Sequence, residues 1–135
     1  MKFVACFIIF ENKILTVKRS SNEVEGGKNG LIGGGIEDGE LAIDSMTREI
    51  REEINLQVNG NDLIDLGNHK LPFNGVEVEF NCYKLNLKES FNPKLDPNEA
   101  EGFEWVTIDE LLSKPNLVSG LGELIEILGK DRIVS

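Results

Sequence analysis

The chain has few of the residues that stabilise a fold through covalent links or zinc. It contains two cysteines, Cys6 and Cys82, and one histidine in 135 residues. Both cysteines lie in apolar stretches and show no C-x-x-C spacing. Isolated thiols of this kind are more often reduced core residues than a disulfide or a ligand pair. The sequence therefore indicates neither a disulfide framework nor a zinc site.

Long hydrophobic runs are also missing. No apolar stretch reaches the ~18 residues that a membrane-spanning helix requires. The apolar segment 3–10 is preceded by a single lysine, Lys2, and is not followed by a small-residue cleavage site, so it predicts a strand rather than a signal peptide. We expect a cytoplasmic protein that does not contact a membrane.

Basic residues are scarce relative to acidic ones. Fourteen Lys and Arg residues stand against 24 Asp and Glu residues, which gives a formal net charge of −10. An extended nucleic-acid groove needs a basic stripe that neutralises phosphates, so polynucleotide binding is not expected. A small phosphorylated ligand remains compatible with this charge if divalent ions lie between the carboxylates and the phosphate oxygens.

The composition that is present is typical of a folded domain. Hydrophobic residues make up 40% and charged residues 28% of the chain, and no internal repeat, linker or low-complexity block interrupts it. A chain of this length can bury a core of its own. We expect one domain that covers residues 1–135.

Hydrophobic periodicity predicts a mixture of strands and helices. Strands are expected over residues 2–10, 13–19, 63–71, 76–87 and 103–106, with a hairpin turn at Glu11-Asn12. The alternation in 76–87 shifts phase at Tyr83, which indicates either a bulge or a strand that passes from one packing environment to another.

Helices are predicted in three places. Five apolar residues with helical spacing follow the glycines at 33–35: Ala42, Ile43, Met46, Ile50 and Ile54. Thr107-x-x-Glu110 has the form of a capping box that opens a short helix. Leu117, Leu121, Leu124 and Leu128 form the apolar face of a last helix that Gly129 ends. This order of elements suits an α+β fold with a mixed sheet between helices.

Residues 33–56 combine three glycines with an acidic helix. The glycines predict a turn with positive φ at which backbone groups approach a ligand closely. Glu49, Glu52 and Glu53 lie within about one helical turn, and Arg48 alone cannot neutralise them. Carboxylates in this arrangement suit Mg²⁺, Mn²⁺ or Ca²⁺. Taken alone, such a run could also be a solvated acidic face.

The spacing in this segment resembles the signature of the Nudix hydrolases, G-x5-E-x7-R-E-U-x-E-E-x-G-U, in which U is a bulky aliphatic residue. The matching residues are Gly34, Glu40, Arg48, Glu49, Ile50, Glu52, Glu53 and Leu56. Asn55 replaces the last glycine, and asparagine is a good substitute in a left-handed helix cap. The tryptophan and proline that often precede the signature are absent. The resemblance implies the α/β/α sandwich of the Nudix fold.

The resemblance also implies roles for individual residues. Glu49, Glu52, Glu53 and the carbonyl of Gly33 would bind Mg²⁺ or Mn²⁺, and Arg48 would orient these carboxylates. Glu40 would be structural. A further acidic ligand is often found on a loop about six positions before a tryptophan, which here is Trp105. Glu99 fits this placement, and Glu101 is a rival.

The activity implied is hydrolysis of a diphosphate bond in a nucleoside diphosphate derivative. Water activated by a divalent metal would attack phosphorus, and Glu53 or Glu99 would accept the proton. The chain looks most similar to small MutT-like pyrophosphohydrolases that act on nucleoside triphosphates or their oxidised forms. Arg19 and Asn116 are the candidate substrate-binding residues.

Other functions stay open at this stage. ADP-ribose, sugar nucleotides, dinucleoside polyphosphates and capped RNA are alternative substrates, although the acidic balance disfavours RNA. A non-catalytic nucleotide sensor would be expected to lose part of the carboxylate cluster, which is intact here. A purely structural interaction module leaves that cluster unexplained. The exposed side of segment 3–10 could pair with a second subunit in a homodimer.

Overall fold

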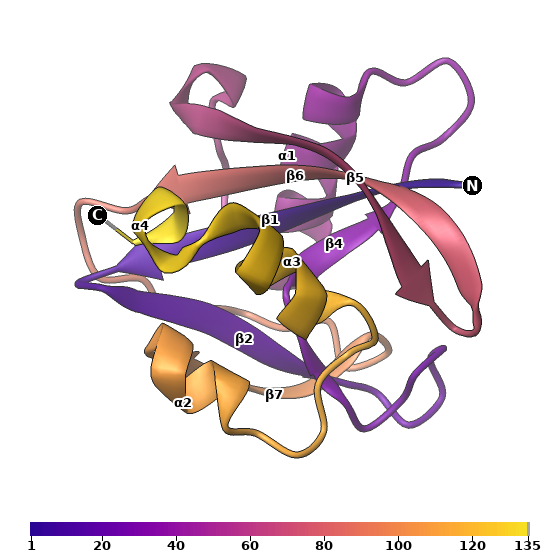
Figure 1. Cartoon of the computed structure of the whole chain (residues 1–135). Coiled ribbons are helices and arrows are strands. Elements are labelled where there is room, and N and C mark those ends of the chain that lie inside the picture. The colour runs from indigo at the N-terminus through magenta and orange to yellow at the C-terminus, as the bar shows by residue number, and fades with distance from the viewer. Residues whose placement is uncertain (135) are drawn as a thin grey trace.

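β1 (Lys2–Phe10) is the central strand of a mixed sheet that carries helices on both faces (Figure 1). This computed structural model describes residues 1–134. The other strands are β2 (Lys13–Arg19), β3 (Asn29–Gly30), β4 (Ile32–Gly35), β5 (Leu63–Phe73), β6 (Val76–Asn86) and β7 (Ala100–Val106). The helices are α1 (Ala42–Ile54), the 3₁₀ turn η1 (Gly60–Asp62), α2 (Ile108–Leu112), α3 (Leu121–Leu128) and α4 (Lys130–Ile133).

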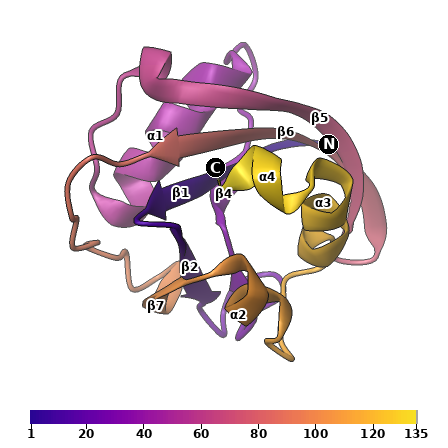
Figure 2. The ribbon, with the colours of Figure 1, turned by 60° about the vertical axis from the view of Figure 1, so that its left-hand side comes forward.

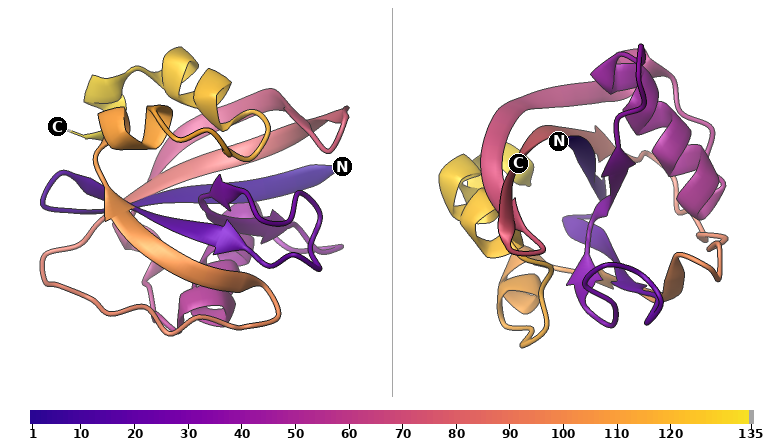
Figure 3. Two further views of the ribbon diagram at one scale, coloured as in Figure 1. Left: turned by 90° about the horizontal axis from the view of Figure 1, so that it is seen from below. Right: turned by 90° about the vertical axis from the view of Figure 1, so that its right-hand side faces the viewer.

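The α+β sandwich predicted from the sequence is confirmed. The apolar side chains form two clusters, one on each face of the sheet. Residues of β1 alternate between them, with Cys6 and Ile8 in the cluster under α1 and Phe7 and Ile9 in the cluster under α2, α3 and α4. Figures 2 and 3 show α1 on one side of the sheet and the three C-terminal helices on the other. Both cysteines are buried and free, as predicted.

β1 and β2 diverge, and this divergence positions the site. The two strands pair only next to their turn, at Ile9–Ile14 and Phe10–Lys13. Farther from the turn, β3 pairs with β2 and β4 pairs with β1, both in antiparallel register. The segment from Asn29 to Gly35 thus crosses from one strand to the other. This segment places the consecutive glycines of β4 against α1.

The glycines at 33–35 do not form the predicted turn. Gly33, Gly34 and Gly35 lie in β4, and none of them has a positive φ. Glycine is needed at position 33 because two strands approach closely, and not because of the approach to a ligand that the sequence suggested. A β-carbon on Gly33 would overlap the carbonyl oxygen of Val4 on the paired strand β1.

Local signals at the helix ends are confirmed. Asn55 caps α1 in the left-handed conformation, with φ 58 and ψ 39. Thr107 and Glu110 form the predicted capping box of α2. The helix predicted to be the last corresponds to α3, which is shorter than predicted because it starts at Leu121 after Gly120 and leaves Leu117 in the preceding loop. The sequence did not predict α4, which follows Gly129. A β-carbon on Gly120 would lie 2.8 Å from the carbonyl oxygen of Pro72, so this loop packs tightly on β5.

The phase shift at Tyr83 arises from the second alternative foreseen for it, a strand that passes from one packing environment to another. Cys82 and Tyr83 are buried on opposite faces of the sheet, because β6 lies between β1 and β5 with both faces covered. A register shift is also present. It lies opposite Tyr83, between Asp65 and Gly67 of β5, rather than in β6 itself.

Among the helices that the structure describes, none is long and apolar enough to cross a membrane.

Candidate metal and substrate site

Three glutamates from two separate segments converge at the end of the sheet where β1 and β2 diverge. Glu49 and Glu53 are one helical turn apart on the inner side of α1, and Glu99 comes from the loop that leads into β7. One carboxylate oxygen from each lies within 4.8 Å of the others. We call these residues the carboxylate cluster. Oxygen ligands at this separation suit a hard divalent cation.

β4 makes room for the cluster. The carboxylate of Glu49 lies against Gly34, where a β-carbon would be 2.6 Å from Oε2 of Glu49. The backbone N–H of Gly33 donates to Oε2 of Glu53 at 3.3 Å. A strand residue directs its N–H and C=O to the same edge, so the carbonyl of Gly33 also faces α1. The predicted carbonyl ligand therefore lies on the side of the cluster.

The electrostatics of the cluster favour a bound cation. Burial and the charges of Glu49 and Glu99 raise the pKa of Glu53 well above its usual range. Burial also raises the pKa of Glu49, against the opposing effect of Arg48, and burial together with Glu49 raises that of Glu99. Among the described residues, Oε2 of Glu99 is a buried side-chain oxygen without a hydrogen-bond partner. Such an atom normally has one, and a divalent cation would satisfy it.

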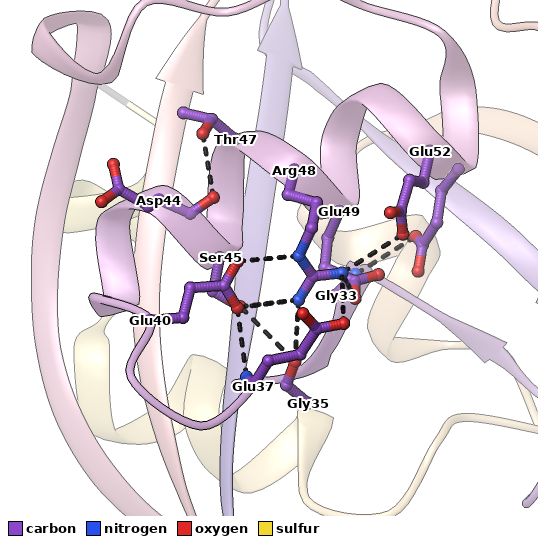
Figure 4. A network of polar contacts seen from close by, with 11 residues as sticks. Gly33, Gly35, Glu37, Glu40, Asp44, Ser45, Thr47, Arg48, Glu49 and Glu52 are labelled. Carbon is purple, nitrogen blue, oxygen red and sulfur yellow. Dashed lines mark hydrogen bonds and ion pairs between the residues drawn. The ribbon is translucent and has the colours of Figure 1, made fainter.

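Arg48 connects Glu49 of the cluster to Glu40 and Gly35 (Figure 4). Its Nε and Nη2 donate to the two carboxylate oxygens of Glu40 at 2.8 and 3.0 Å, which is a bidentate pair. Nη1 donates to Oε1 of Glu49 at 2.8 Å, and Nη2 also donates to the carbonyl of Gly35 at 3.1 Å. The two hydrogen bonds that Arg48 donates to Glu40 lower the pKa of Glu40 to about 2. Arg48 thus contacts both Glu49 and Glu40, and the orienting role of Arg48 and the structural role of Glu40 stay predictions.

Two predicted candidates lie outside the cluster. Glu52 is not one of its members: its side chain is 48% exposed and accepts a hydrogen bond at 3.2 Å from Nη1 of Arg48, the atom that also donates to Glu49. The metal-binding and catalytic roles of Glu52 stay predictions. Glu101 accepts a hydrogen bond from the backbone N–H of Ser21 at 3.0 Å and lies 3.9 Å from Lys18. The geometry therefore favours Glu99 over Glu101.

A cavity of about 440 Å³ opens beside the carboxylate cluster. This volume is within the range of small-molecule sites. Part of its lining is apolar and includes three aromatic rings. Phe3 stacks on Phe80 with a centroid distance of 5.4 Å and lies 5.5 Å from Phe73. The cavity therefore has one anionic end and one aromatic wall.

Arg19 is the one cationic side chain among the described residues that line this cavity. Its guanidinium carbon lies 5.7 Å from the centre of the Phe73 ring, and its Nε donates to the carbonyl of Val24 at 2.7 Å. The predicted partner in substrate binding, Asn116, is exposed in the loop before α3 and does not line the cavity. The structure therefore places Arg19, but not Asn116, where a ligand would bind.

The aromatic wall was not predicted from the sequence. Phe3, Phe73 and Phe80 come from β1, β5 and β6, and parallel pairing of β1 with β6 places Phe3 opposite Phe80. The alternation of Val76, Val78 and Phe80 marks one face of a strand. It does not show that this face borders a cavity, because the pairing partners are distant in sequence.

The fold and the site together define an α+β protein with a carboxylate cluster suited to a divalent cation, placed at one end of a ligand-sized cavity. The chain belongs to the NUDIX domain family, whose model matches residues 2–127. A Deinococcus radiodurans protein named Nudix hydrolase is 30% identical over 83 residues, which cover 62% of this chain and 47% of that protein. The match thus spans about half the length of this relative.

Solved structures share the fold. The MutT protein of Methanosarcina mazei superposes with a TM-score of 0.83 and 20% identity, covering 97% of this chain and 94% of that one. The NUDIX domain of Shewanella oneidensis NrtR, solved in complex with ADP ribose, gives a TM-score of 0.74 and 20% identity, covering 98% and 86% of the two chains.

Proposed function

We propose that this protein hydrolyses a diphosphate bond in a nucleoside diphosphate derivative, with Mg²⁺ or Mn²⁺ as its cofactor. The observation that carries the proposal is the convergence of Glu49, Glu53 and Glu99 at the mouth of a cavity that also contains Arg19 and an aromatic wall. Glu49, Glu53, Glu99 and the carbonyl of Gly33 would hold the metal. A bound ion would lower the pKa of its water ligand and neutralise charge on the phosphate oxygens.

The residues of the chain provide the other parts of the chemistry. Water attacks one phosphorus, the bond from that phosphorus to the bridging oxygen breaks, and the bridging oxygen leaves with the second phosphate. Glu53 and Glu99 are the candidate proton acceptors, because both carboxylates line the cavity, and Oε2 of Glu99 has no hydrogen-bond partner among the described residues. Arg48 and Glu40 keep Glu49 in position through charge-assisted hydrogen bonds.

The lining of the cavity supports a substrate that combines a flat ring with phosphates. The rings of Phe3 and Phe73 would contact a base, since stacking and apolar contact stabilise aromatic groups in such pockets. Arg19 would contact a phosphate. Nucleoside triphosphates or their oxidised forms are the substrates that we favour. ADP-ribose and sugar nucleotides are the alternative, which the ADP-ribose complex of a structural relative makes worth testing.

The test is product release from a substrate panel with Mg²⁺, with Mn²⁺ and with a chelator. The panel contains unmodified and 8-oxo nucleoside triphosphates, ADP-ribose, sugar nucleotides and dinucleoside polyphosphates. Turnover of one class that the chelator abolishes is the expected result. If no compound is hydrolysed but a nucleotide raises the melting temperature, the protein is a sensor and the proposal fails.

A further inference from the structure

The loop from Ser20 to Lys28, between β2 and β3, contains a buried carboxylate that the chemistry above does not use. The side chain of Glu25 is 5% exposed. Its backbone has a φ of 56, in the left-handed region that residues other than glycine rarely occupy. A glutamate is seldom so deeply buried without charge partners or hydrogen bonds. The burial of Glu25 therefore depends on the contacts that its carboxylate makes.

Three donors from three chain segments converge on this carboxylate. Oε2 accepts the backbone N–H of Asn74, in the β5–β6 turn, at 2.7 Å. Oε1 accepts the backbone N–H of Ser119, in the loop before α3, at 2.8 Å, and the ammonium of Lys28 at 3.2 Å. Burial alone would raise the pKa of Glu25, but these bonds lower it to about 2. The carboxylate is thus ionised at neutral pH and joins the three segments.

Each joined segment contributes to the rim of the substrate cavity. Val24 precedes Glu25, Phe73 precedes Asn74, and Val118 precedes Ser119, and all three line the cavity. The hydrogen bonds of Glu25 go to none of the residues in the carboxylate cluster. Glu25 therefore affects the substrate end of the site rather than the metal end.

Residues next to these hydrogen bonds also contact Arg19, the cationic side chain of the cavity. Arg19 donates to the carbonyl of Val24 and lies over the ring of Phe73. Val24 and Phe73 are the residues directly before Glu25 and its partner Asn74. Movement of either segment would change the orientation of the guanidinium.

We propose that Glu25 is a positioning residue for substrate binding, which fixes the rim of the cavity and orients Arg19 by joining three chain segments. This inference rests on the proposed function. It predicts that Glu25 contributes to the capture of substrate and not to the chemical step.

The test is Glu25→Gln, assayed with the best substrate of the panel. Glutamine keeps the side-chain length but places an NH₂ donor against a backbone N–H donor, so one of the hydrogen bonds is lost. We expect KM to rise on the order of tenfold, as for the loss of one hydrogen bond to a charged group, with kcat within about twofold. Hydrogen exchange at the amides of Asn74 and Ser119 should become faster, while the amides of α1 keep their wild-type rates.

Glu126→Gln, which removes a charge from the exposed side of α3, is the matched control and should leave KM unchanged. If Glu25→Gln does not fold, Glu25→Asp replaces it, because the shorter carboxylate keeps its charge but cannot reach both amides. A wild-type KM in the folded variant, or a loss confined to kcat, overturns the inference while the proposed function stands. A wild-type protein that hydrolyses no compound of the panel overturns the proposed function, and this inference with it.

Discussion

Gly34 and Glu49 fit each other across the boundary between β4 and α1, because the carboxylate of Glu49 occupies the space where a side chain at position 34 would lie. This fit makes glycine necessary at position 34 for a reason other than backbone conformation, since the φ of Gly34 is not positive. The strand and the helix are therefore matched at a single side chain, and that side chain belongs to the carboxylate cluster.

Gly34→Ala should displace Glu49 and disrupt the cluster. A new methyl group in this space should lower the free energy of unfolding by about 1 to 3 kcal/mol. It should also remove most of the rise in melting temperature that Mg²⁺ produces in the wild type. Thermal unfolding with and without Mg²⁺ measures both effects. Gly35→Ala is the control, because its β-carbon would meet nothing nearer than a ring carbon of Phe3 at 3.9 Å. Equal Mg²⁺ responses in the two variants would contradict the role assigned to Gly34.

Arg48→Lys tests the orientation of Glu49. Lysine keeps the positive charge but cannot form the bidentate pair with Glu40 while also reaching Glu49. We expect kcat to fall by about 10- to 100-fold, as is typical when the support of a metal ligand is lost. Steady-state kinetics measure this effect. A variant with wild-type kcat would show that charge at position 48 is sufficient.

Glu53→Gln should separate activity from stability. We expect kcat to fall by at least about 100-fold, because the variant loses a metal ligand and a candidate base. In metal-free protein near neutral pH the melting temperature should rise, by about 2 to 4 °C for each kcal/mol of repulsion relieved. Glu52→Gln is the comparison, and its smaller expected loss of kcat follows from its greater exposure and its position outside the carboxylate cluster. Equal losses in the two variants would place Glu52 in the site.

The metal-free protein should lose stability as the pH rises from 4.5 towards the raised pKa of Glu53. The pKa of Glu53 in the folded state is raised above its ordinary value of 4.5, so between these two values the folded state binds more protons than the unfolded state. Stability then falls with rising pH in this window. Glu25 and Glu40, whose pKa values are lowered to about 2, act in the opposite direction, and their stabilisation is lost as the pH falls from 4.5 towards 2. Melting temperatures of wild type and Glu53→Gln between pH 3 and 9 test the signs, and curves of the same shape above pH 5 would refute this account.

Arg19→Ala should weaken substrate binding. The lost guanidinium should raise KM on the order of tenfold, because a charged hydrogen bond to phosphate contributes about 1.5 to 3 kcal/mol. Lys18→Ala is the matched control, since Lys18 is exposed and directed towards Glu101. Asn116→Ala should likewise leave KM near the wild-type value, as Asn116 does not line the cavity. A large effect at Asn116 would restore the substrate role that the sequence suggested.

The features that the sequence determined are local. The stripe of α1, its cap at Asn55 and the Thr107–Glu110 capping box each depend on residues a few positions apart in the chain. The backbone geometry of one helix fixes such contacts, so spacing alone predicts them. The same reasoning placed Glu49 and Glu53 together, because residues four apart share one helix face.

The tertiary structure decided which of the remaining candidates meet. Several features depend on segments that are distant in sequence. They are the choice of Glu99 over Glu101, the position of Glu52 outside the carboxylate cluster, the strand at 33–35, the aromatic wall and the hydrogen bonds of Glu25. Sequence periodicity shows which face of an element is apolar, but not which other element packs against it. That pairing follows from the packing of the whole sheet and its helices, and it turns separate carboxylates into one site.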